Sequence, residues 1–117
     1  MNKEVIAQLS DLPDRSPAYA LVGEVDLVVV RFDDEISVFY GRCLHRGALM
    51  SDGFVRGDNL ICGLHDWDYR LDSGVSEYAN DEALPKFKSW LDGNDICVDA
   101  DESNAWGHAN PQPFNRD

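Results

Sequence analysis

The chain has 117 residues, with ten Lys and Arg against 22 Asp and Glu and a formal net charge of −12. This length suits one compact domain with its own core. So acidic a surface repels phosphate backbones and anionic lipids, and no apolar run approaches a membrane span, so we expect no nucleic-acid and no membrane binding. The odd number of cysteines and the absence of a leader pattern favour a cytoplasmic protein with free or metal-bound thiols.

Short strands separated by turns dominate the first hundred residues. The predicted strands are 4–9, 19–22, 26–32, 36–40, 54–55, 59–62, 67–71, 86–91 and 95–98. Many short strands joined by regular turns predict an all-β fold, an antiparallel β sandwich or barrel. We expect one domain over residues 1–100 and a tail or linker over 101–117, because that last segment has few core residues and two prolines.

Four candidate metal ligands stand in two short motifs. Cys43-Leu44-His45 is followed, after sixteen residues, by Cys62-Gly63-Leu64-His65. Two thiolates and two imidazoles suit Zn²⁺, or a [2Fe–2S] cluster with the cysteines on one iron and the histidines on the other. A zinc finger normally places a pair of histidines on a helix, whereas these ligands alternate on loops between strands. A zinc-stabilised structural or interaction domain with no redox role is the alternative.

The two motifs resemble those of Rieske [2Fe–2S] proteins, and residues 43–48 and 62–69 look like the cluster loops of the ferredoxin and oxygenase branch. The resemblance covers about residues 4–100. It implies a Rieske-type antiparallel β sandwich or barrel with a small cluster-binding subdomain, formed by two loops within about 42–74. It also implies that a [2Fe–2S] cluster is held by Cys43, His45, Cys62 and His65, with the two histidines at the tip. Their implied neighbours are Arg46, Gly47, Leu64, Trp67 and Tyr69.

The neighbours of the ligands predict a low reduction potential. High-potential Rieske proteins join the two loops by a disulfide, but Ala48 and Leu64 stand at those positions. They also direct a Ser and a Tyr hydroxyl at the sulfurs, which favours the reduced cluster. Here Trp67 replaces the Ser, and Tyr69 matches the Tyr, with strand packing as its alternative role. One donor is lost, so we expect a potential near the low end of the Rieske range of about −150 to +300 mV.

Charged residues beside both loops predict a cluster tip of mixed charge. Arg42 and Arg46 flank the first loop, and three carboxylates flank the second: Asp66, Asp68 and Asp72. The net charge of −12 either steers a basic partner toward the chain or only confers solubility.

The remaining residues argue for a carrier and not for an enzyme. Beyond His45 and His65 only His108 remains, so the chain cannot supply the two histidines that bind an oxygenase iron together with a carboxylate. We predict one-electron transfer, by a ferredoxin-like carrier or by the Rieske module of a larger oxidoreductase. Its expected partners are a reductase, an oxygenase or a fused flavin domain. Residues 74–78 and 110–117 resemble the N-terminal Rieske region of FMN-binding proteins of the glutamate synthase family, which favours the module.

Overall fold

The structure is a computed structural model that describes residues 2–43, 48–63, 67–76 and 83–110. Strands dominate these residues, as predicted, and two short 3₁₀ turns and one helix complete them. The strands are β1 (Lys3–Gln8), β2 (Ala18–Val22), β3 (Val25–Phe32), β4 (Glu35–Tyr40), β5 (Phe54–Arg56), β6 (Asn59–Ile61), β7 (Asp68–Arg70), β8 (Lys86–Phe87), β9 (Ser89–Asp92) and β10 (Asp95–Asp99). The turns are η1 (Leu9–Asp11) and η2 (Met50–Asp52), and the helix is α1 (Ala100–Ala109).

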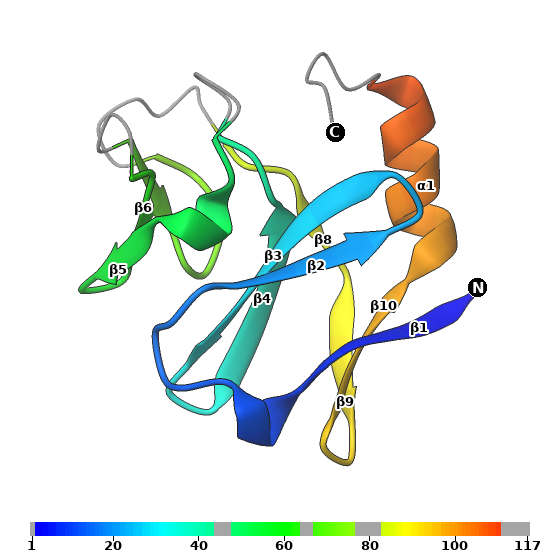
Figure 1. The fold of residues 1–117 in the computed structure, drawn as a ribbon, viewed down its shortest axis with the longest axis horizontal. Helices are drawn as coiled ribbons and strands as arrows, with labels where there is room; N and C mark the ends of the chain where they lie inside the picture. The colour runs from blue at the N-terminus through cyan, green and yellow to red at the C-terminus, as the bar shows by residue number, and fades with distance from the viewer. Residues whose placement is uncertain (1, 44–47, 64–66, 77–82, 111–117) are drawn as a thin grey trace.

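The strands form three antiparallel sheets in space (Figure 1). A four-stranded sheet has the order β2-β3-β4-β8, and a three-stranded sheet has the order β1-β10-β9. These two sheets make up what we call the base. The third sheet, β5-β6-β7, lies to one side of the base and carries the segment between the two ligand motifs. We call residues 41–76 the cluster-binding subdomain. The predicted all-β fold with a small subdomain is therefore confirmed.

Strand β3 is the structural centre because both of its faces are buried. Leu27 and Val29 point into the core between the two base sheets. Val28 and Val30 point the other way, into a second core shared with the cluster-binding subdomain. All four side chains are fully buried. The uninterrupted apolar run of this strand follows from that position, since a strand with one face in water would alternate apolar and polar residues.

Two glycines let the subdomain backbone pack closely. A Cβ at Gly53 would lie 2.0 Å from the carbonyl oxygen of Ile61, so only glycine fits where the chain passes β6. At Gly41, where the chain leaves β4, a Cβ would lie 2.7 Å from the backbone carbon of Leu27. These contacts place Gly41 against β3 and Gly53 against β6.

The predicted strand 86–91 is two strands in the structure. Residues 86–87 pair with β4, whereas 89–92 pair with β10 in the other base sheet. The break falls at Lys88, whose amide donates to the Glu102 side chain and not to a strand neighbour. The chain thus changes sheets at Lys88, which a run of strand-forming residues does not reveal.

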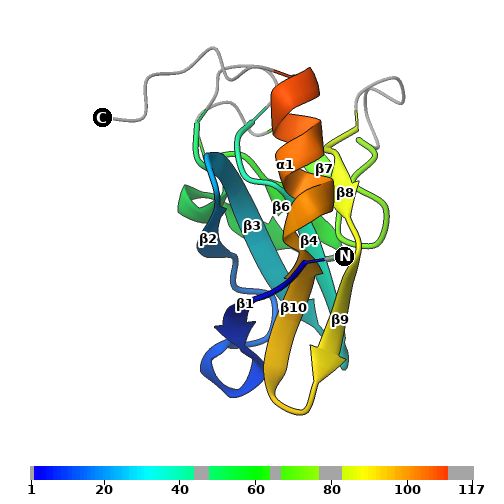
Figure 2. The same cartoon turned by 90° about the vertical axis from the view of Figure 1, so that its right-hand side faces the viewer.

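Residues 100–109 form a helix, where the sequence predicted a tail or linker from residue 101 (Figure 2). Asp99 caps the helix by accepting a hydrogen bond from the Asp101 amide at 3.0 Å. Trp106 packs against Tyr40 and Phe87, with ring centroids 4.6 Å and 5.7 Å apart. The prediction missed this helix because a single aromatic side chain anchors it, with few other apolar residues. Residues 111–117 lie outside the described residues, and no helix among the described ones is long and apolar enough to cross a bilayer.

Candidate metal centre

The first ligand motif begins at the neck of a narrow loop. The Cys43 amide donates to the Ala48 carbonyl at 2.8 Å, and the Met50 amide donates to the Gly41 carbonyl at 2.7 Å. Arg42 and Leu49 form an antiparallel bridge between these two bonds. The chain therefore runs out and back as a short ladder, and Cys43 is the last described residue before the tip.

The second motif repeats this arrangement at the end of the β6–β7 hairpin. Pairing runs from Asn59↔Arg70 to Ile61↔Asp68. The Cys62 amide then donates to the Trp67 carbonyl at 2.8 Å. In both loops the cysteine amide is thus bound by the carbonyl five residues later. Each cysteine is held by regular backbone pairing at the base of its loop.

Both cysteines of the motifs are buried in one apolar cluster. Cys43 and Cys62 have no exposed surface, and neither is in a disulfide. They share the second core with Met50, Leu60 and Tyr69. The fold thus brings together two thiols that are 19 positions apart in the sequence and belong to two separate hairpins.

The predicted neighbours Trp67 and Tyr69 lie in the same cluster. Tyr69 is fully buried, and its hydroxyl lies 4.0 Å from Sγ of Cys43. Trp67 is partly buried against this cluster. The other predicted site residues lie outside the described residues: His45, Arg46, Gly47, Leu64 and His65.

The two buried thiols of Cys43 and Cys62 suit the cysteine-bound iron of a metal cluster. Two buried thiols in apolar surroundings are poor sites for thiolates unless a cation compensates their charge. Iron in a [2Fe–2S] cluster supplies that charge and, when bound, supplies one-electron chemistry. The chain itself contributes paired backbone under each cysteine, an apolar wall that excludes water, and the Tyr69 hydroxyl beside Cys43.

A buried ion pair next to the first motif was missed by the sequence analysis. The Asp26 carboxylate accepts from Arg42 Nε at 2.7 Å and from the Tyr19 hydroxyl at 2.6 Å. Asp26 is 2% exposed, and the Arg42 side chain is 16% exposed. The one sequence signal was a carboxylate directly before a run of four apolar residues, Leu27 to Val30, in a predicted strand.

The sequence analysis expected Asp66, Asp68 and Asp72 to flank the second loop and give the tip a mixed charge. Asp66 lies outside the described residues, and the other two do not lie at the tip. Asp68 is buried and accepts a hydrogen bond from the Ser76 hydroxyl at 2.8 Å. Asp72 lies beyond the far end of β7, where the Arg70 guanidinium holds the pKa of its carboxyl below the usual range. Both carboxylates thus belong to the body of the subdomain.

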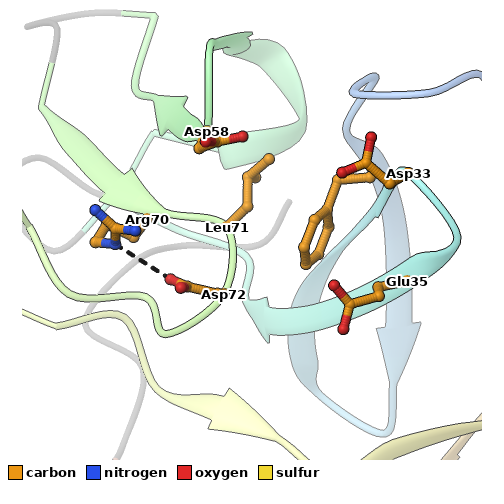
Figure 3. A pocket seen from close by; sticks show the side chains of 7 residues that line it. Asp33, Glu35, Asp58, Arg70, Leu71 and Asp72 are labelled. Atoms are coloured by element: carbon orange, nitrogen blue, oxygen red, sulfur yellow. Dashed lines mark hydrogen bonds and ion pairs between the residues drawn. The ribbon is translucent and has the colours of Figure 1, made fainter.

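The far end of β7 forms one wall of an acidic pocket of about 210 Å³ (Figure 3). The other wall is the turn between β3 and β4. Phe32 and Leu71 are its apolar lining, and its charged residues are Asp33, Glu35, Asp58, Arg70 and Asp72. The negative charge of this region is therefore concentrated at the junction of base and subdomain, on the opposite end of β7 from Trp67.

The comparison with known proteins supports the same architecture. The family model described as "Rieske [2Fe-2S] domain" matches residues 2–88. The ferredoxin of carbazole 1,9a-dioxygenase from Nocardioides aromaticivorans IC177 has a similar fold, with a TM-score of 0.76 at 21% identity over 84% of this chain and 97% of that one.

Two curated relatives differ in how much of their length is matched. The ferredoxin component of the alkene monooxygenase system of Xanthobacter autotrophicus is 22% identical over 94 residues, which are 80% of this chain and 77% of that protein. The carnitine monooxygenase oxygenase subunit of Escherichia coli is 31% identical over 70 residues, which are 59% of this chain. The chain thus spans about a fifth of the length of that oxygenase subunit.

The match to the family model covers most of the chain, including both ligand motifs and the two hairpins that carry them. Together with the paired loops and the buried cysteines, it confirms the expected fold and the expected [2Fe–2S] cofactor. The assignment of the individual ligands stays a prediction. The chain belongs to the Rieske [2Fe–2S] domain family.

Proposed function

We propose that the chain transfers single electrons through a [2Fe–2S] cluster bound by Cys43, His45, Cys62 and His65, without catalysing a reaction by itself. The observation that carries this proposal is the pair of buried cysteines, each held under a loop by the same backbone hydrogen bond. In this arrangement the thiolates are the inner ligands. The histidines, which follow within each loop, are the ligands through which electrons enter and leave.

The chain's own residues support a potential at the low end of the Rieske range. Ala48 packs against the second core, and Leu64 stands at the other position of the family disulfide, so that disulfide cannot link the two loops. The Tyr69 hydroxyl, at 4.0 Å from Sγ of Cys43, is at most a weak donor. Fewer and weaker hydrogen bonds to sulfur favour the oxidised state and lower the potential.

The partners we propose are redox proteins: a reductase or fused flavin domain that supplies the electron, and an oxygenase that receives it. A relative of comparable length is a ferredoxin component of a monooxygenase system. A similar ferredoxin has also been solved in a complex of reduced oxygenase and oxidized ferredoxin. A cytoplasmic location belongs to this proposal, supported by three buried cysteines that form no disulfide.

The visible absorption spectrum of anaerobically purified protein, before and after dithionite, tests the proposal. We expect sulfur-to-iron charge-transfer bands that bleach on reduction, and two irons per chain. In His65→Cys, we expect iron to stay bound while the Rieske-type spectrum is lost, because the fourth ligand changes from nitrogen to sulfur. A colourless protein with one zinc per chain, from cells supplied with iron, would overturn the proposal in favour of a structural domain.

Cys97 offers the matched control. It is fully buried, like the proposed ligands, but lies in β10 in the base. We expect Cys97→Ser to retain both irons and the native spectrum, whereas Cys43→Ser and Cys62→Ser lose them. Equal iron loss in all three variants would mean that burial of a thiol, and not ligation, explains the effect.

A further inference from the structure

Asp26 and Arg42 form an ion pair that is largely removed from water. Arg42 donates from Nε to one carboxylate oxygen of Asp26 at 2.7 Å, and Tyr19 donates its hydroxyl to the other at 2.6 Å. Both carboxylate oxygens are therefore occupied, and Asp26 is 2% exposed. This contact joins the first residues of β3 to the chain that enters the first loop.

The pair is linked to the backbone that leads into the first proposed ligand. Arg42 precedes Cys43 in the chain, and the Asp26 carbonyl accepts from the Gly41 amide at 2.7 Å. Gly41 in turn accepts from Met50, on the returning side of the loop. Asp26 thus holds residues 41–42 by its main chain and by its side chain at once. Because Arg42 and Cys43 are consecutive, a contact that fixes Arg42 also restricts the backbone at Cys43.

Stability alone does not explain a buried ion pair. Moving two charges out of water costs about as much free energy as their attraction returns, and apolar residues of similar size often serve as well. In low-dielectric surroundings, however, a charge acts strongly on a neighbouring redox centre. An uncompensated guanidinium beside a thiolate ligand would favour the reduced, more negative cluster, and an uncompensated carboxylate would favour the oxidised one.

We propose that the Asp26–Arg42 pair is a positioning device with a balanced charge: it fixes the neck of the first loop without shifting the reduction potential. This inference rests on the proposed function, since it assumes that Cys43 is a cluster ligand. The Arg42 side chain binds Asp26 at the start of β3. The Asp26 carboxylate balances the positive charge that Arg42 places near the first proposed ligand. Tyr19 holds the carboxylate in place.

The test is the reduction potential of three purified holoproteins, measured by circular dichroism during a redox titration. Asp26→Asn keeps the shape of the side chain and removes one negative charge while the charge of Arg42 stays, so we expect the potential to rise. Arg42→Gln removes one positive charge while the buried carboxylate stays, so we expect the potential to fall. A loosened loop would shift both variants in the same direction, whereas charge compensation shifts them in opposite directions.

Two controls isolate the charge. Tyr19→Phe removes a hydrogen bond to the same carboxylate without changing the charge, and we expect a smaller shift than in either charge variant. Asp34→Asn removes an equal charge from the turn at the opposite end of β3, where the side chain is exposed, and we expect the native potential. An unchanged or lowered potential in Asp26→Asn would overturn the inference.

The double variant covers the case in which a single variant fails to hold iron. Asp26→Asn/Arg42→Gln leaves neither charge alone, so we expect it to retain iron at a potential between those of the single variants. Loss of iron from the double variant as well would overturn the claim that charge balance is what the pair provides. The proposed function fails separately, if the native protein itself shows no iron–sulfur spectrum.

Discussion

The base and the cluster-binding subdomain are each stabilised in a different way. In the base, β3 pairs with five residues of β2 and six of β4, and a continuous apolar core fills the space between the two sheets. In the subdomain, each strand has three residues, and the proposed ligands Cys43 and Cys62 are part of its core. A three-residue strand pair is only marginally stable by itself. We infer that apolar packing organises the base and that the bound cluster organises the tips of the subdomain.

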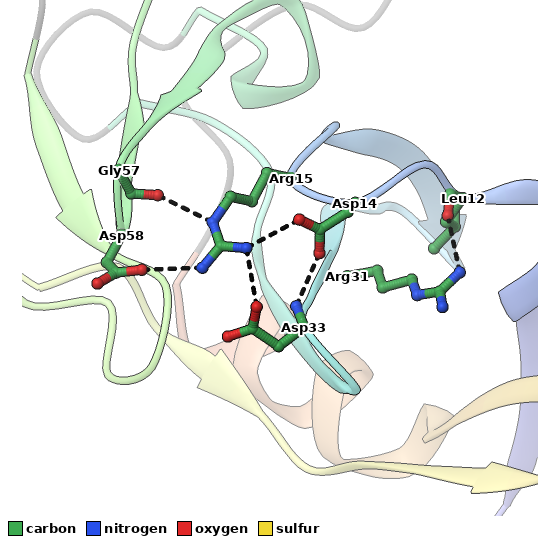
Figure 4. Close-up of polar contacts among 7 residues, drawn as sticks. All are labelled: Leu12, Asp14, Arg15, Arg31, Asp33, Gly57 and Asp58. Carbon is green, nitrogen blue, oxygen red and sulfur yellow. Dashed lines mark hydrogen bonds and ion pairs between the residues drawn. The ribbon is translucent and has the colours of Figure 1, made fainter.

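A network around Arg15 joins the two regions (Figure 4). Its guanidinium binds carboxylates of Asp14 and Asp33 on the base, at 2.8 Å and 3.2 Å. On the subdomain side it binds the Asp58 carboxylate at 3.0 Å and the Gly57 carbonyl at 3.1 Å. One side chain therefore ties the β3–β4 turn to the β5–β6 turn. Two of its partners, Asp33 and Asp58, also line the acidic pocket.

Removing a proposed ligand should have the largest effect, and it should affect the subdomain but not the base. In Cys62→Ser we expect amide protection in β6 and β7 to fall by about 100-fold or more, because metal binding and local folding are coupled. Protection in β3 and β10 should stay close to native. Hydrogen exchange followed by mass spectrometry measures both regions in one experiment. Cys97→Ser is the control, and an equal loss across both regions would refute the division.

Trp106 tests whether α1 belongs to the base, since it lies beyond the residues that match the family model. Trp106→Ala should lower the free energy of unfolding by about 3 kcal/mol, the lower end for loss of a large aromatic, because the ring is only partly buried. Trp106→Phe retains a ring against Tyr40 and should cost about 1 kcal/mol. Urea unfolding measures both, and no change in Trp106→Ala would make α1 an appendage.

Val28 and Val29 probe the two faces of one strand. Both are fully buried, and they differ only in facing the subdomain or the base core. We expect each Val→Ala change to lower the free energy of unfolding of the holoprotein by about 2 kcal/mol. After iron removal, the cost should persist for Val29→Ala and shrink for Val28→Ala, because the core around Val28 has already loosened. Equal costs in the apoprotein would contradict this.

The smallest expected effect is on the stability of the fold at low pH. Hydrogen bonds from Arg15 and from the Asp33 amide hold the pKa of Asp14 below its usual range. A lowered pKa in the folded state means that the carboxylate stabilises the fold above pH of about 4 and that this contribution is lost as the pH falls further. Asp14→Asn should be slightly less stable at pH 7 and lose less on acidification. Urea unfolding across this pH range checks it, with Asp34→Asn, an exposed carboxylate next to Asp33, as the control.

Local pattern was enough to predict the strands and the ligand motifs. Alternation and β-branched residues placed β2, β3, β4 and β10, since these features act within a few residues. The motifs of Cys43 and Cys62 predicted the loops for the same reason: ligand spacing is a local property. Both cysteines were found buried in one cluster, as a shared metal site requires.

Tertiary structure alone decided the features that depend on distant partners. At the break between β8 and β9, the Lys88 amide binds Glu102 and not a strand neighbour. Helix α1 is held in place by the packing of Trp106 against Tyr40 and Phe87. The charge balance of Asp26 depends on Arg42, 16 positions away. The sequence by itself determined which residues could form strands and bind metal, because those properties are local. Which charges meet, which strand is buried on both faces and where the chain changes sheets were decided by packing, because burial is a property of the whole fold.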